Sequence, residues 1–332
     1  MRAFGWALGP SCCVSLFIGA AAPASADDST AGLAAGGLTL LKSTAVSMTS
    51  ENLYISQKAV RVRYVFLNTT GKDITATMVF PMPDVTIDGP EEQPLIPKDA
   101  NNFLGFSTNV EGKPVVAQLQ QDAVQGATDR TALLKSLGVP LAPFLDATGK
   151  ALMKLPAATQ AQLIKLNLAE PFQYDAGKGE VNELIPTWTL KESYVWPITF
   201  PAGKPVTVTH DYTPSMGGYA GMRSTDPSDT ADRAKYCIDQ SFLAGLAKAQ
   251  GPNNLINFDE GDLSYVLTTG ANWKGPIGVF HLTIDKGAAA NLVSFCGTGV
   301  TRSGPTSYSV TYKNYTPTRN VDVLLALAPG RQ

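Results

Sequence analysis

The stretch that decides the fold is AVRVRYVFLNTTGKDITATMVFPMPD, residues 59–84. Every second residue is apolar in two runs, 60–66 and 74–80. Alternation with a period of two, in residues that are largely β-branched or aromatic, predicts half-buried strands. The polar run 68–73 between them supplies turn chemistry, and Pro81 ends the second strand because it has no N–H for a ladder. We therefore expect an antiparallel hairpin that forms the first pair of a β-sandwich.

Composition supports a β-rich chain with a large core. The chain has 332 residues, of which 44% are hydrophobic, enough for one large domain or two. Only 16% are charged, while 30 glycines and 23 prolines favour turn-rich β architecture. The net charge of −2 gives no electrostatic reason to expect nucleic acid or an anionic membrane as a partner. We expect a mainly β chain with a helical insertion, an antiparallel β-sandwich of two packed β units.

The N-terminus has the features of a secretory signal peptide. An apolar run from Phe4 to Ala22 follows Arg2, and Ala24-Ser25-Ala26 is a small-residue cleavage site. We expect residues 1–26 to be removed near Ala26 and the mature protein to be periplasmic or secreted. No later stretch approaches the roughly 20 apolar residues that a membrane helix needs, so no transmembrane segment is expected in the mature chain.

Cysteine usage agrees with export. Cys12 and Cys13 leave with the signal, so Cys237 and Cys296 are the pair that remains. An even pair in an oxidising compartment predicts one disulfide. Two alternatives stay open at this point, a nucleophilic Cys296 and a metal pair, although a catalytic thiol needs a base such as histidine.

The mature chain divides into three regions by pattern. Residues 27–215 are expected to form a β-sandwich with a helical insertion at about 122–168, where apolar residues switch to three- and four-residue spacings. Residues 216–332 are expected to form a second β unit with a leading helix. That helix should begin near Asp226 and run past Cys237 towards Lys248. The insertion either buries an apolar stripe on the sandwich or covers a ligand cleft.

Aromatic residues and histidines supply the candidate ligand-binding residues. Trp188 and Trp196 share one parity in a strand-like run, and an aromatic row of this kind is either a sugar-stacking platform or the inward face of a sandwich. The chain has two histidines, His210 and His281, and each is expected to be buried and hydrogen-bonded. The candidates are Trp188, Trp196, His210 and Trp273.

Recognised catalytic motifs do not occur. There is no HExxH helix, CxxC pair, GxSxG elbow or glycine-rich phosphate loop, so zinc, nucleotide and serine-hydrolase chemistry lack their minimum set. No catalytic residue, metal ligand or cofactor is assigned. Carboxylates gather in three places: Asp84, Asp88, Glu91 and Glu92 in an expected loop; Asp226, Asp229 and Asp232 at an expected helix start, where the macrodipole favours them; and Asp259, Glu260 and Asp262 in an expected turn. Solvated carboxylates explain these groups, although oxygen-rich loops could also hold calcium.

Several landmarks resemble those of the bacterial domain-of-unknown-function family numbered 4424. The most specific is TGANWKGPI, residues 269–277; others are Phe80-Pro81-Met82-Pro83, Trp188-Thr189-Leu190, Tyr212-Thr213-Pro214 and Ser294-Phe295-Cys296-Gly297. The resemblance covers nearly the whole mature chain and implies an exported bacterial protein without an assigned activity. The YVFLN…FPMPD segment also resembles the opening of the vault/inter-alpha-trypsin sandwich domains, which serve extracellular interactions.

These observations favour a non-catalytic binding or interaction module at the cell envelope, with an envelope protein or a small ligand as its partner. Two alternatives belong to other classes. One is a carboxylate-dependent envelope hydrolase acting on glycans, and the other is a carrier of a small apolar ligand beneath the helical insertion. Which ligand is bound, whether the protein is an enzyme, its oligomeric state and its biological process do not follow from the sequence.

Overall fold

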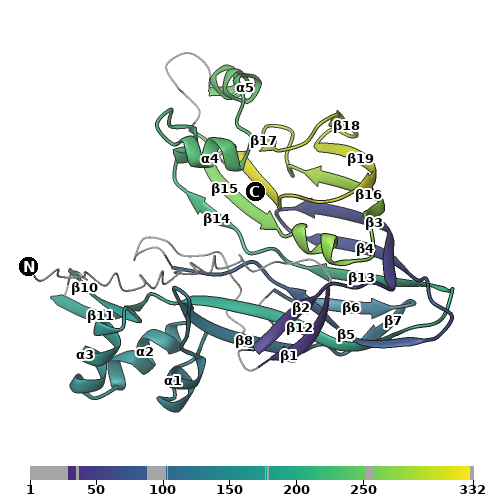
Figure 1. The fold of residues 1–332 in the computed structure, drawn as a ribbon. Helices are drawn as coiled ribbons and strands as arrows, with labels where there is room; N and C mark the ends of the chain where they lie inside the picture. The colour runs from purple at the N-terminus through teal and green to yellow at the C-terminus, as the bar shows by residue number, and fades with distance from the viewer. Residues whose placement is uncertain are drawn as a thin grey trace, which may run out of the picture.

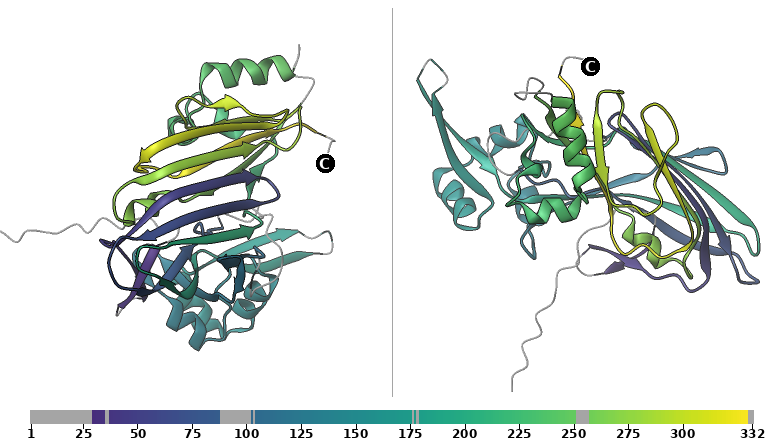
Figure 2. Two further views of the ribbon diagram at one scale, coloured as in Figure 1. Left: turned by 90° about the vertical axis from the view of Figure 1, so that its right-hand side faces the viewer. Right: turned by 90° about the horizontal axis from the view of Figure 1, so that it is seen from above.

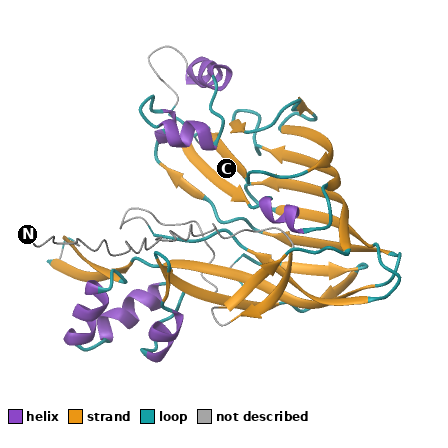
Figure 3. Ribbon diagram, viewed as in Figure 1, coloured by secondary structure: helices purple, strands orange, loops and turns teal. Residues whose placement is uncertain are grey.

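The computed structural model describes residues 29–34, 37–87, 102, 104–175, 177, 179–250 and 257–329. The expected signal peptide and its cleavage site lie outside the described residues. Strands dominate, which confirms the mainly β prediction, and helices are confined to two regions and short turns (Figures 1 and 3). No helix in this part of the chain is long and apolar enough to cross a bilayer.

An eight-stranded sheet, curled into a half-barrel, forms one wall of the molecule. Its strand order is β18 (Thr301–Arg302), β19 (Ser307–Tyr315), β16 (Ile277–Asp285), β3 (Val46–Ser56), β4 (Val60–Asn68), β13 (Pro205–Tyr212), β6 (Ser107–Val110) and β7 (Lys113–Val115). All its neighbours are antiparallel except β3 and β16, which run parallel. This parallel pair joins the first and last thirds of the chain in one sheet. The eight-stranded sheet therefore contains strands from both sides of the expected domain boundary at residue 216.

Two smaller sheets pack on the inner face of the eight-stranded sheet. The six-stranded sheet has the order β2 (Gly37–Leu41), β1 (Ser29–Ala34), β5 (Ile74–Pro81), β12 (Thr189–Phe200), β8 (Gln118–Gln125) and β9 (Thr128–Asp129). The four-stranded sheet has the order β14 (Gly217–Tyr219), β15 (Asp259–Tyr265), β20 (Val321–Leu327) and β17 (Leu292–Phe295). Buried side chains from all three sheets form one continuous core, which is the expected sandwich-like arrangement.

The predicted hairpin of residues 60–81 is wrong in its pairing. Both strands exist where expected, but β4 lies in the eight-stranded sheet and β5 in the six-stranded sheet. The turn at 68–73 therefore carries the chain from one sheet to the other, and the two apolar faces meet across the core instead of side by side. The ring centroids of Phe66 on β4 and Phe200 on β12 are 5.8 Å apart across this gap. Alternation reveals which face is buried, but it does not reveal which strand is the neighbour.

A second crossing lies beside the first. β12 and β13 are joined by a short turn and again belong to different sheets, with β12 paired to β5 and β13 paired to β4. Asn68 fastens the two turns together. Its buried side chain donates hydrogen bonds to the carbonyl oxygens of Phe200 at 2.8 Å and Lys72 at 2.7 Å. The backbone carbonyl of Asn68 also accepts a hydrogen bond from the N–H of Gly203 at 3.0 Å. The corner of the sandwich is thus closed by one amide side chain.

The helical insertion contains three helices, α1 (Thr131–Ser136), α2 (Asp146–Lys154) and α3 (Ala157–Lys165). The first residues of the expected range, 122–125, belong to β8. One buried leucine on each helix, Leu134, Leu152 and Leu163, joins the main core. A two-stranded ribbon, β10 (Ala169–Asp175) and β11 (Glu180–Pro186), follows and projects from this end of the molecule (Figure 2).

The helix expected from residue 226 towards Lys248 is broken into two. α4 (Thr230–Lys235) is capped by Asp229, whose side chain accepts the N–H of Asp232, and α5 (Gln240–Gln250) follows separately. Cys237 lies between them with a φ of 52°, a left-handed conformation that ends the first helix. The two helices cover the outer face of the four-stranded sheet, where Phe242 and Leu246 meet Leu324 and Ala326. The described residues also contain two short 3-10 turns, η1 (Arg223–Thr225) and η3 (Thr268–Asn272).

Candidate functional site

All four aromatic and histidine candidates lie inside the core. The exposed fractions are 0% for Trp188, 1% for Trp196 and Trp273, and 3% for His210. The structure brings two of them together, because the rings of Trp196 and His210 lie 5.2 Å apart between the sheets. Trp188 instead faces the helical insertion, where its indole N–H donates to the carbonyl of Leu141 at 2.7 Å. The row is therefore an inward face of the sandwich in this structure.

Trp273 and His281 differ in their surroundings. Trp273 packs with its ring centroid 4.4 Å from that of Phe66, deep in the core. His281 was expected to be buried, but it lies half-buried on the outer face of β16, with both ring nitrogens engaged. Nδ1 is 2.8 Å from the hydroxyl of Thr311 and Nε2 is 3.2 Å from that of Thr283. Its apolar sequence neighbours pack inward, and alternation places His281 on the opposite face.

Glu192 is a buried carboxyl that the sequence analysis missed. It is 3% exposed, and burial raises its pKa to about 7. One of its oxygens accepts a hydrogen bond from the Gln121 amide at 2.5 Å, and the other has no partner among the described residues. Its position in the inward-facing row of β12 was the available signal, because a charged residue at a core position of a strand is uncommon.

The carboxylate groups serve local structure. Asp84 pairs with the ammonium of Lys191 at 2.9 Å, while Asp88, Glu91 and Glu92 lie outside the described residues. The other two groups meet at Ser224, whose hydroxyl oxygen lies 2.6 Å from a carboxylate oxygen of Glu260 and 3.1 Å from one of Asp232. Within the described ranges, no three histidine, cysteine or carboxylate side chains are arranged to hold a metal ion.

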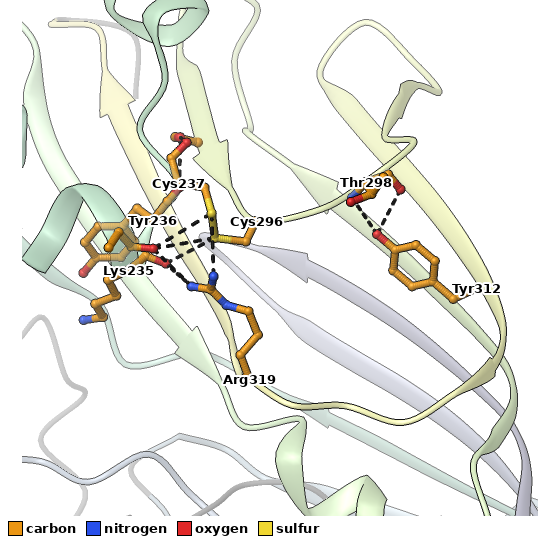
Figure 4. Close-up of a disulfide and its surroundings, with 9 residues drawn as sticks. Lys235, Tyr236, Cys237, Cys296, Thr298, Tyr312 and Arg319 are labelled. Atoms are coloured by element: carbon orange, nitrogen blue, oxygen red, sulfur yellow. Dashed lines mark hydrogen bonds between the residues drawn. A yellow bond between two sulfur atoms is a disulfide. The ribbon is translucent and has the colours of Figure 1, made fainter.

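Cys237 and Cys296 form the predicted disulfide, with their Cα atoms 5.1 Å apart (Figure 4). The bond ties the α4–α5 junction to the chain that follows β17. The guanidinium of Arg319 lies against it and donates to Cys237 Sγ at 3.6 Å and to the carbonyl of Lys235 at 2.6 Å. A bonded sulfur carries no thiolate, so this state of the protein offers no nucleophile at Cys296.

A groove of about 340 Å³ lies on the outer face of the eight-stranded sheet. None of the described helices crosses this face, which is turned towards the viewer in the left panel of Figure 2. Strands β3, β4, β13 and β6 contribute the lining, although they are far apart in the sequence. The lining residues are Asn52, Tyr54, Arg61, Val62, Arg63, Asn109, Thr209, His210 and Asp211. The side chains of Val62 and His210 are buried, so these two belong to the core beneath the groove.

Side chains on this face form two rows that cross the strands. The register places one row in the order Thr311, His281, Asn52, Arg63, Thr209, Asn109. The second row runs Ser309, Thr283, Tyr54, Arg61, Asp211, Ser107. Because all these residues share the outward parity, each row presents its side chains to solvent in line.

Contacts between neighbouring side chains fix part of the second row. Arg61 pairs with Asp211 at 2.8 Å and also lies over the ring of Tyr54, 5.4 Å from its centroid. The Tyr54 hydroxyl donates to Asp285 at 3.1 Å, and partial burial raises the pKa of Tyr54. These contacts orient one wall of the groove before any ligand arrives.

The four residues of the first row that line the groove make few hydrogen bonds with other side chains. Across the part of the chain that the structure describes, the side chains of Asn52, Thr209 and Asn109 form no hydrogen bond to another residue. Arg63 makes one long hydrogen bond, 3.4 Å to the hydroxyl of Thr207. Amide, hydroxyl and guanidinium groups beside a fixed wall can bind a polar ligand. Sequence reasoning missed this site because its residues meet only through strand register.

Comparisons with known proteins place the chain in a family but not in a pathway. A family model described as "Domain of unknown function (DUF4424)" matches residues 26–324. No curated protein matches. A crystal structure of a proposed nutrient-binding protein from Legionella pneumophila resembles the chain with 18% sequence identity and a TM-score of 0.41, covering 92% of this chain and 73% of that one.

Proposed function

This chain belongs to the DUF4424 family of unknown function, and from that premise we propose that it is an exported, non-catalytic binding module of the cell envelope whose ligand site is the groove on the outer face of the eight-stranded sheet. The observation that carries the proposal is a set of three polar side chains in that groove, Asn52, Thr209 and Asn109, which form no hydrogen bond to another described residue. Strands β3, β13 and β6 place them beside Arg63 of β4, on a face that none of the described helices crosses (Figure 2). Polar groups that converge beside an oriented wall are typical of ligand sites.

Two features support export. The first 26 residues have the pattern of a signal peptide, and the structure contains a disulfide, which persists in oxidising compartments. Fractionation of cells that produce the full chain tests this part. Recovery of a reduced, uncleaved chain in the cytoplasm would contradict it.

Ligand-induced stabilisation tests the site. Purified residues 27–332 are screened with saccharides, amino acids and small organic acids while the melting temperature is followed. A ligand at 100 times its Kd stabilises the folded state by about 2.7 kcal/mol, which is an easily measured shift. The double variant Asn52→Ala, Asn109→Ala should lose the shift, and Gln173→Ala on the projecting ribbon is the matched control. Equal shifts in all three proteins would show that the ligand binds elsewhere.

One observation favours a carboxylate-dependent hydrolase as a second candidate: the pKa of Glu192 is about 7, in the range of a general acid. Its 3% exposure argues against contact with a substrate. Turnover of glycan or peptidoglycan by the purified protein, abolished in Glu192→Gln, would favour the hydrolase. For the apolar carrier, the buried leucines of the insertion already pack on the core. Native mass spectrometry that detects co-purified lipid would favour that alternative.

A further inference from the structure

We infer that the ligand of the groove is an acidic glycan, extended across the strands with a sugar carboxylate bound by Arg63. This inference rests on the proposed function, because it assigns a chemical class to the ligand of the same site. It follows from the charge state of the groove, the direction of its polar row and the kinds of side chain in that row.

Arg63 supplies the positive charge at the centre of the groove. In the described part of the chain the ion pairs are Arg61 with Asp211 and Lys191 with Asp84, so Arg63 has no carboxylate within ion-pair distance. Its row neighbours on β3 and β13, Asn52 and Thr209, are neutral. A guanidinium presents a planar fork of N–H donors that matches a carboxylate bidentately. The centre of the groove is therefore complementary to one negative group.

The polar row is extended in the direction that crosses the strands. Neighbouring strands lie about 4.8 Å apart, so the four residues of the row that line the groove, on four strands, extend over about 14 Å. An inorganic anion would contact Arg63 and leave the rest of the row unused. An oligosaccharide laid across the strands would pass Asn52, Thr209 and Asn109 in turn, with a rise per sugar close to the strand spacing.

The side chains in the row favour a glycan, with its many hydroxyl groups, over other polymers. Amide and hydroxyl side chains both donate and accept hydrogen bonds, as sugar hydroxyls do. Tyr54, half-buried and fixed by Arg61 and Asp285, adds an aromatic edge beside the row. A nucleic acid would need many phosphate contacts, and the groove has one arginine without a carboxylate partner.

The test compares charged and neutral forms of the same glycans. Calorimetric titrations of residues 27–332 use oligogalacturonate, oligomannuronate and muramic-acid-containing glycan strands, together with the methyl ester of oligogalacturonate and a poly-glutamate peptide. We expect at least one acidic glycan to bind, and Arg63→Gln to weaken it roughly 10- to 100-fold, the effect of one charge-assisted hydrogen-bond pair. The methyl ester should bind the wild type as weakly as the acid binds Arg63→Gln. Arg223→Gln, which removes the same charge away from this sheet, should change nothing.

Each other outcome overturns the inference. If the acid and its ester bind equally and Arg63→Gln has no effect, Arg63 binds no sugar carboxylate and the inference is wrong, while the Asn52→Ala, Asn109→Ala variant still decides whether the glycan binds in the groove. If poly-glutamate binds as tightly as the glycans and depends equally on Arg63, the ligand is an acidic peptide. If no acidic glycan binds while another polar compound shifts the melting temperature through Asn52 and Asn109, the proposed function stands and the glycan is wrong. Circular dichroism of each variant ensures that lost binding is not lost folding.

Discussion

The hydroxyl oxygens of Tyr64 and Tyr265 lie 2.6 Å apart in the core, although 201 positions separate the residues in the chain. Tyr64 belongs to β4 of the eight-stranded sheet and Tyr265 to β15 of the four-stranded sheet. The Tyr265 hydroxyl also lies 3.3 Å from a carboxylate oxygen of Glu51, which is 1% exposed. One polar network thus joins the first and last thirds of the protein inside an apolar core.

Removing the Tyr265 hydroxyl should weaken this junction. We expect Tyr265→Phe to lower the free energy of unfolding by about 1–3 kcal/mol, because buried polar atoms of its partners lose a hydrogen bond. The urea unfolding midpoint measures the change. Tyr308→Phe on β19, half-buried at the surface, is the matched control and should change the free energy by less than about 0.5 kcal/mol. Equal effects of the two substitutions would show that the buried network contributes nothing specific.

Asn68→Ala should be more damaging. The side chain donates to two carbonyls, at 2.7 and 2.8 Å, and its oxygen accepts from the N–H of Thr70 at 2.9 Å and from the Thr70 hydroxyl at 2.8 Å. The substitution leaves the backbone carbonyls of Phe200 and Lys72 without their hydrogen-bond donor. We therefore expect the free energy of unfolding to fall by about 2–4 kcal/mol. Thr70→Ala removes one exposed hydroxyl at the same turn and should cost less than half as much. A loss below 1 kcal/mol for Asn68→Ala would show that the corner does not depend on the amide.

Glu192 should make stability depend on pH. Its pKa is about 7 in the folded protein against 4.5 for an ordinary glutamate, so between these values the folded state keeps a proton that the unfolded state releases. The unfolded state binds fewer protons there, so the stability that Glu192 contributes is fully present below about pH 4.5 and is lost as pH rises towards 7, a change of about 3 kcal/mol from this residue.

The variant Glu192→Gln isolates that contribution. It keeps an oxygen that accepts from the Gln121 amide but carries no charge. We expect it to be more stable than the wild type at pH 8 and to match it near pH 4, as measured by urea midpoints across the range. Glu183→Gln on the projecting ribbon is the exposed control and should show no such pH-dependent difference. A Glu192→Gln protein that is less stable than wild type at pH 8 would mean that the charged carboxylate has a partner of its own.

The disulfide closes a loop with a sequence separation of 59 residues, for which chain entropy predicts a stabilisation of about 4 kcal/mol. We expect Cys296→Ser to lower the melting temperature markedly while far-UV circular dichroism stays β-rich. Denatured, unreduced residues 27–332 should contain no titratable thiol. Two thiols per chain in that sample would rule out the disulfide and make Cys296 available as a nucleophile again.

Local sequence determined the elements of this protein. Alternation located the strands on either side of residues 68–73, because a pleated strand exposes alternate residues to opposite faces whatever its neighbours are. Apolar spacing predicted a helical insertion at about 122–168, and the structure has three helices there. Counting cysteines after the expected signal peptide left one pair, Cys237 and Cys296, which the structure joins.

The tertiary structure alone decided which strands are neighbours, and with them the candidate site. β4 and β5 have the alternation of a hairpin, yet they lie in different sheets and their apolar faces pack across the core. Glu192 owes its raised pKa to that burial. Asn52, Arg63, Thr209 and Asn109 form a row only because four strands adopt one register. Register is a relation between distant segments, set by the packing of the whole core, and no local pattern contains it.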